Sequence, residues 1–168
     1  GSGSAELYEA GSKKLETTST GVDITGTAVT DGVTVDGTLD IEEVVEKVEP
    51  SNSTTGTISF DFLDQAIINF TSDQTANRTI NFRGNSSTAL NSMLSTNQSV
   101  TCSIVMKQGS TAYYLNAYQI DGSTVTPEWS GGSAPSAGNA SSLDVYTFTI
   151  IKTADATFTV LASQTQYA

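Results

Sequence analysis

Few residues in this sequence have side chains that could do catalytic chemistry. There is no histidine, the commonest general base and the commonest transition-metal ligand in proteins. The only cysteine, Cys102, has no partner for an intrachain disulfide and lies in an apolar alternation with Val100, Ile104 and Met106. This pattern favours a small buried side chain over a nucleophile, so we expect no cysteine hydrolase.

Carboxylates could act in pairs or bind a metal ion. Asp61 and Asp64 are close in sequence and Asp73 follows, and a glycosidase needs two carboxylates across a cleft. However, acids are sparse in this region and fall at turn-like or strand-edge positions, without the spacing of a calcium-binding loop. No glycine-rich phosphate loop with its lysine is present either. We therefore expect solvated surface carboxylates, no metal, no cofactor and no enzymatic activity.

Aromatic residues could carry a binding function. Tyr113, Tyr114, Tyr118 and Trp129 fall on neighbouring predicted strands, and stacked rings are a common way to hold sugars and to build interfaces. The alternative is that half of these rings fill a core. For Trp129 the following glycines favour an anchor beneath the next loop.

That loop covers residues 130–142 and is rich in Gly, Ser, Pro and Ala. Loops of this length in compact domains are usually functional or mobile. We therefore predict binding positions at Ser133, Pro135 and Asn139, together with the four aromatic residues above. The alternative is that the loop wraps one end of its own domain or packs on a neighbouring chain.

The overall composition excludes two classes of partner. The 168 residues carry a net charge of -11 and no basic cluster, which argues against nucleic-acid binding. No apolar stretch approaches the ~20 residues of a membrane span, so no membrane insertion is expected. Only 37% of residues are hydrophobic and 15% charged, and Ser, Thr, Asn and Gly fill the remainder. Such a composition suits strands with one solvated face, joined by turns.

Period-two alternation dominates residues 56–168 and predicts an antiparallel β-sandwich. Turn signals such as Asp121-Gly122 separate the apolar runs. The expected strands cover residues 58–62, 66–71, 79–82, 99–107, 112–120, 124–129, 143–152 and 157–162, and a short helix is expected within 86–96.

The N-terminal part has a different organisation. Residues 1–4 read GSGS, the pattern of an expression scar or linker. Residues 21–27 and 32–38 form a repeat at an offset of 11 residues, in which Val or Ile alternates with polar residues between glycines. Two short strands of this kind cannot close a core, so they must stack on other copies or on other chains.

Residues 40–49 change to helical spacing, with Ile41, Val44, Val45 and Val48 on one face and Pro50 as the stop. A helix of about ten residues does not persist alone in water. Its apolar stripe is expected to pack either in a short coiled-coil seam between chains or on its own domain.

Two stretches resemble a known group of proteins. Residues 7–22, LYEAGSKKLETTSTGV, resemble a segment of tail fibre and other virion proteins of marine and cyanobacterial phages, where it precedes Gly-Val repeats like those found here. NRTINFRG at 77–84, WSGGSAP at 129–135 and DVYTF at 144–148 resemble the C-terminal domain of structural proteins of contractile-tailed cyanophages. Together the resemblance covers nearly all of residues 5–168.

The resemblance implies a non-enzymatic virion structural protein, located in a tail fibre or other surface appendage. It implies a homotrimer that contacts other virion proteins and whose terminal domain recognises the host surface, with a cell-surface glycan as one possible ligand. The trimer interface would then be built from apolar residues of the N-terminal region: Val22, Ile24, Val33, Val35, Ile41, Val44, Val45 and Val48. The alternative is a lectin-like carbohydrate-binding module of an extracellular protein, although a repeat leading directly into a compact domain favours the fibre.

The expected protein is therefore all-β. A β-repeat shaft segment covers residues 5–39, a short helix and connector cover 40–50, and an antiparallel β-sandwich domain covers 51–168.

Overall fold

The computed structural model describes residues 3–30 and 32–168; the first two residues of the predicted GSGS linker lie outside it. The chain divides into two compact units, residues 1–43 and 44–168. Strands predominate in both, and the one helix in the described ranges has four residues, so the expected all-β class is confirmed. That helix is too short to cross a membrane.

The first unit contains a small antiparallel sheet. Its strands are β1 (Glu6–Glu9), β2 (Ser12–Thr17) and β3 (Val22–Ile24), in the order β1-β2-β3. Ala10 and Gly11, between β1 and β2, both have positive φ, as a tight two-residue hairpin turn requires. The first repeat copy thus contributes β3, whereas residues 32–38 of the second copy form no strand or helix.

The helix expected at residues 40–49 is not formed. Residues 40–47 have no regular secondary structure, and the next element, β4 (Val48–Ser51), is a strand. Two physical factors explain the difference. A segment this short cannot pay the cost of helix nucleation without a packing partner, and the backbone of Val48–Ser51 instead pairs with the strand at Ile67–Phe70.

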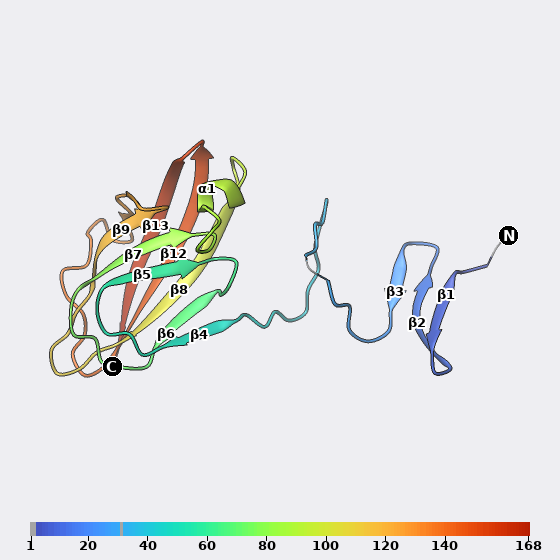
Figure 1. The fold of residues 1–168 in the computed structure, drawn as a ribbon, viewed down its shortest axis with the longest axis horizontal. Helices are drawn as coiled ribbons and strands as arrows, with labels where there is room; N and C mark the ends of the chain where they lie inside the picture. The colour runs from blue at the N-terminus through green and yellow to red at the C-terminus, as the bar shows by residue number, and fades with distance from the viewer. Residues whose placement is uncertain (1–2, 31) are drawn as a thin grey trace. The chain divides into compact units, whose positions relative to one another are not determined.

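Residues 44–168 form two sheets (Figure 1). The smaller has the order β10-β9-β7-β5, and the larger the order β11-β13-β12-β8-β6-β4. The smaller sheet consists of β5 (Thr57–Asp61), β7 (Arg78–Arg83), β9 (Leu115–Ile120) and β10 (Ser123–Thr124). The larger consists of β4, β6 (Ile67–Phe70), β8 (Ser99–Lys107), β11 (Glu128–Trp129), β12 (Leu143–Ala154) and β13 (Thr157–Tyr167). The helix α1 (Leu90–Met93) lies between β7 and β8 in sequence.

The expectation of purely antiparallel sheets is wrong. β4, β6 and β8 are parallel neighbours in one sheet, and β5, β7 and β9 are parallel neighbours in the other. The chain alternates between the two sheets from β4 to β9, so neighbours within a sheet are two strands apart in sequence and run in the same direction. Antiparallel pairing occurs where consecutive strands share a sheet, as in the long β12–β13 hairpin, and also between β8 and β12.

One hydrophobic core joins the two sheets. Phe82 of β7 and Phe148 of β12 meet edge to face, with ring centroids 4.9 Å apart. Around them lie buried side chains from both sheets, among them Phe60, Ile104 and Ile150. The two inner faces therefore pack on each other as in a sandwich, and β5, β7, β8 and β12 show the alternation of buried and accessible residues that the sequence predicts.

Candidate functional site

The predicted interface residues of the N-terminal region are all accessible in the single chain. The exposed fraction of these eight side chains runs from 43% for Val35 to 89% for Val45. The set is Val22, Ile24, Val33, Val35, Ile41, Val44, Val45 and Val48. Scattered exposed apolar residues are ordinary, but a run along one segment marks an interaction surface.

Two of the predicted binding aromatics point into the core. In the register of β11 against β13, Trp129 is the partner of buried Ala162, so its side chain lies on the inner face. Its ring meets Tyr118 at 5.4 Å and Phe148 at 6.2 Å, both edge to face. Tyr118 is buried, donates its hydroxyl hydrogen to the Leu115 carbonyl, and has a pKa raised by burial. Tyr118 therefore offers no free face on which a sugar could stack, and Trp129 is partly buried against the core.

Tyr113 and Tyr114 lie in the connection before β9 and are half-buried. Tyr114 packs against the edge of the core, and its backbone N–H donates to the side chain of Asn77. The structure therefore does not bring the four predicted aromatics together on one exposed surface.

The 130–142 loop is attached to the sandwich by its C-terminal half. The Asn139 backbone N–H donates to the Asp144 carboxylate at 3.0 Å, and its side-chain amide donates to the Tyr167 carbonyl at 3.0 Å. Gly138 has no space for a side chain, because a Cβ there would lie 2.3 Å from the Tyr113 carbonyl oxygen. Ser133 is exposed and Pro135 is half-buried, so the first half of the loop offers the accessible positions.

Asp144 is the centre of a buried polar cluster that the sequence analysis did not identify. Besides Asn139, the side-chain amide of Gln108 donates to its carboxylate at 2.9 Å and to the Tyr113 carbonyl at 2.8 Å. The Tyr113 N–H in turn donates to the Gln108 side-chain oxygen. The cluster links the connection before β9 to the 130–142 loop, and its groups are satisfied internally rather than presented to a ligand. The alternation of residues along β12 could have revealed that Asp144 is buried, because it shares its face of the strand with Tyr146 and Phe148.

Burial raises the pKa of the Asp144 carboxyl, although hydrogen bonds from Asn139 and Gln108 oppose the shift. Native Asp144 therefore keeps its proton to a higher pH than it does in the unfolded chain, where the pKa of an aspartate carboxyl is about 3.9. The native state loses stability as the pH rises from the pKa of Asp144 in the unfolded chain through its higher pKa in the native state.

We expect the substitution Asp144→Asn, which removes this titration, to gain stability relative to the wild type as the pH rises. The comparison is urea unfolding of both proteins from about pH 3 to about pH 7. Asparagine changes some hydrogen bonds at every pH. The test is therefore how the difference in unfolding free energy between variant and wild type depends on pH, and not how large that difference is. A difference that stays constant across the range would contradict the prediction.

Two of the three carboxylates considered in the sequence form ion pairs, the third, Asp64, is exposed, and the thiol is buried. Asp61 binds Arg83 with an oxygen-to-nitrogen distance of 2.5 Å, and Asp73 binds Lys107 at 3.0 Å. Cys102 is buried and its thiol pKa is raised by desolvation, which keeps it protonated. Among the described residues no group of three His, Cys, Asp or Glu side chains is placed to hold a metal ion.

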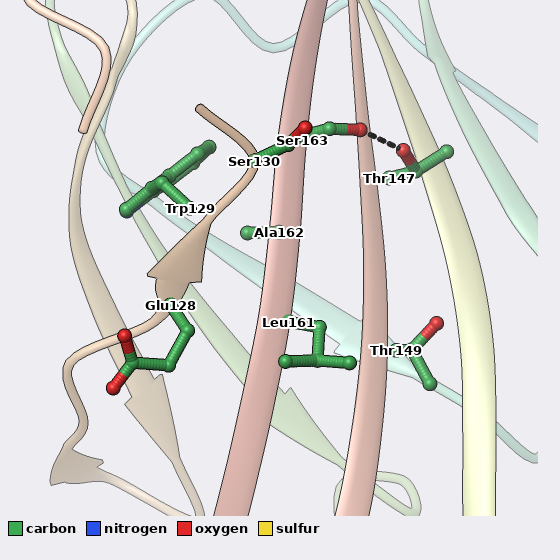
Figure 2. A pocket seen from close by; sticks show the side chains of 8 residues that line it. All are labelled: Glu128, Trp129, Ser130, Thr147, Thr149, Leu161, Ala162 and Ser163. Carbon is green, nitrogen blue, oxygen red and sulfur yellow. Dashed lines mark hydrogen bonds between the residues drawn. The ribbon is translucent and has the colours of Figure 1, made fainter. Parts of the chain in front are cut away.

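A shallow hollow of about 450 Å³ lies on the outer face of the larger sheet. Thr147 and Thr149 of β12 and Leu161 and Ser163 of β13 form its floor, and β11 forms one wall (Figure 2). Thr147 and Ser163 hydrogen-bond to each other at 2.5 Å. Figure 2 also shows the side chains of Glu128 and Trp129 turned away from this row of hydroxyls. Glu128 and Trp129 also line the hollow, but their side chains do not converge with the hydroxyl groups of its floor.

Comparisons with protein-family models, with curated proteins and with solved structures find no match to this chain.

Proposed function

We propose that this chain is a non-enzymatic structural protein of a bacteriophage virion, a homotrimeric tail fibre or similar appendage whose terminal sandwich presents a host-recognition surface. The observation that carries the proposal is the run of exposed Val, Ile and Leu side chains between Val22 and Val48. Apart from β3 and the start of β4, the described residues of this stretch have no regular secondary structure and no core of their own.

Such a stretch makes physical sense in an assembly. Each exposed apolar side chain contributes roughly 25 cal/mol per Å² once a neighbouring chain removes it from water. Three copies side by side would also give the second repeat, residues 32–38, the strand partner that a single chain does not provide. The resemblance of residues 7–22 and of the terminal domain to phage tail proteins supports the same conclusion.

The lectin-like alternative has less support. Of the rings best suited to stacking on a sugar, Tyr118 lies in the core and Trp129 packs against it. Host recognition in this proposal uses weak contacts repeated over the copies of the assembly, for which avidity compensates. Other virion proteins would be the partners at the opposite end of the appendage.

The mass in solution tests the proposal. At micromolar concentration we expect a species of three times the 17.5 kDa of one chain, by light scattering and by sedimentation. The double substitution Val44→Ser and Val45→Ser is expected to shift the protein to monomer, because it removes two apolar side chains from the proposed interface. The fold of the single chain should be unaffected, because both side chains are exposed and make no core contact.

The matched control is Leu63→Ser, which changes an exposed apolar side chain outside this segment and should leave the mass unchanged. A monomeric wild type under these conditions would refute the proposal. An unchanged trimer in the double variant would place the interface elsewhere.

A further inference from the structure

The larger sheet has an outer face that nothing within residues 44–168 covers. β8, β12 and β13 lie side by side in register, and their inner side chains form the core. The side chains between them point outward and are mostly valine, isoleucine, threonine and serine. No charged residue occurs from Ser99 to Val105, from Val145 to Ile151 or from Thr159 to Thr165.

The outer face of the smaller sheet is different. Thr57 is paired with Thr79, Ser59 with Asn81, and Asp61 with Arg83 in the register of β5 against β7. These side chains are polar, and the last pair forms an ion pair. A face of polar side chains is well solvated by water. The outer face of the larger sheet, in contrast, combines the apolar side chains of Val105, Val145 and Leu161 with hydroxyl groups.

The charge of the chain restricts how copies can approach one another. The chain has a net charge of -11, so a surface that carries carboxylates meets like charge when two copies approach each other. The outer face of β8, β12 and β13 brings none together. It is therefore a surface on which identical chains can pack without like-charge repulsion.

The same face is continuous with the apolar segment. Val48 of β4 is paired with Ile67 of β6, and Ile67 is paired with Ser103 of β8. Because Ile68 is buried and the side chains alternate, Ile67 and its partners lie on the outer side. Val48 comes shortly after Val44 and Val45 in sequence, with Glu46 and Lys47 between, so the exposed apolar residues extend onto the sheet.

The size of the face is in the range of protein interfaces. β8, β12 and β13 have 9, 12 and 11 residues. At ~3.3 Å per residue and ~4.8 Å between strands, they cover about 500 Å² in projection. β4 and β6 enlarge this area toward the ~800 Å² per partner of a stable complex.

We propose that the outer face of β4, β6, β8, β12 and β13 packs against copies of this same chain in the assembled protein. The inference rests on the proposed self-assembly and extends it, since it places the contact on the sandwich and not only on the N-terminal segment. A glycan or another virion protein on this face would be the competing outcome.

The test introduces one negative charge into the centre of the face in the full-length chain. Thr149→Glu lies on the central strand β12, and Thr79→Glu on the central strand β7 of the other sheet is the matched control. We expect Thr149→Glu to raise the concentration of half-assembly by about tenfold or more, because every copy brings a buried like charge to the interface. Thr79→Glu should leave that concentration unchanged.

Circular dichroism and thermal melting establish that each variant is folded. If Thr149→Glu fails to fold, Thr101→Glu, an exposed position opposite it on β8, serves in its place. Assembly unchanged by a folded charge variant would overturn this inference while leaving the homotrimer standing. Unchanged assembly with loss of host-cell binding would assign the face to an external ligand instead. A monomeric wild type would refute both proposals.

Discussion

Replacing Arg78 by methionine is expected to destabilise the sandwich by about 3 kcal/mol. Hydrogen bonds to charged groups contribute ~1.5–3 kcal/mol each, and water can replace some of the hydrogen bonds that Arg78 makes. Arg78 is buried in β7, and its guanidinium donates to the Gly56 carbonyl at 2.6 Å, the Ser53 carbonyl at 3.2 Å and the Gln74 side chain at 2.8 Å. It also lies 5.0 Å above the ring of Phe70. Methionine keeps the length and the apolar stem but leaves the loop before β5 without its donors.

Urea unfolding followed by the fluorescence of the single tryptophan, which lies in the sandwich, measures this loss. The matched control is Arg83→Met on the same strand. Arg83 and its partner Asp61 are partly exposed, and surface ion pairs contribute at most about 1 kcal/mol. Equal effects of the two substitutions would show that Arg78 does not have the proposed role.

Truncating Trp129 to alanine is expected to cost about 3 kcal/mol of stability, in the range for large-to-small changes in cores. The ring fills the space between Tyr118 and Phe148, and its removal leaves a cavity where β11 covers the edge of the larger sheet. If Trp129 were instead an exposed stacking platform, the substitution would reduce glycan binding and leave stability almost unchanged.

Thermal and urea unfolding followed by circular dichroism measure the effect, because the fluorescence probe is lost. Tyr113→Ala provides the comparison. Tyr113 is half-buried in a connection, and its contribution to the loop comes through its backbone groups. We expect a change below about 1 kcal/mol for Tyr113→Ala, as is usual away from buried contacts. A larger loss for Tyr113 than for Trp129 would reverse the assignment of core and surface rings.

Local alternation was sufficient to predict most strands of the sandwich. The strand expected at residues 99–107 is β8 with the same bounds, and the hairpin expected after residue 143 is β12 and β13. A strand with one buried face must place apolar residues at every second position, so its existence is encoded locally. The same rule could have revealed two buried charges, because Arg78 shares its face with Ile80, and Asp144 with Tyr146.

The pairing of the strands was not encoded in this local way. Alternation shows which side chains face inward, but it does not show which sheet a strand joins. Parallel neighbours such as β5 and β7 arise because the chain crosses between the two sheets at each step. The inward position of Trp129 likewise follows from the register of a two-residue strand against β13, which is far along the chain.

The difference between what the local sequence pattern predicts and what the packing of the folded chain adds is clearest from Val22 to Val48. The spacing of its valines and isoleucines is that of side chains buried on one face, and this spacing predicted a helix at 40–49. In the folded chain these side chains are exposed, and Val48–Ser51 is a strand beside β6. The physical reason is that a short amphipathic segment takes the conformation its partner stabilises, and hydrophobic spacing specifies a buried face without specifying the surface that buries it.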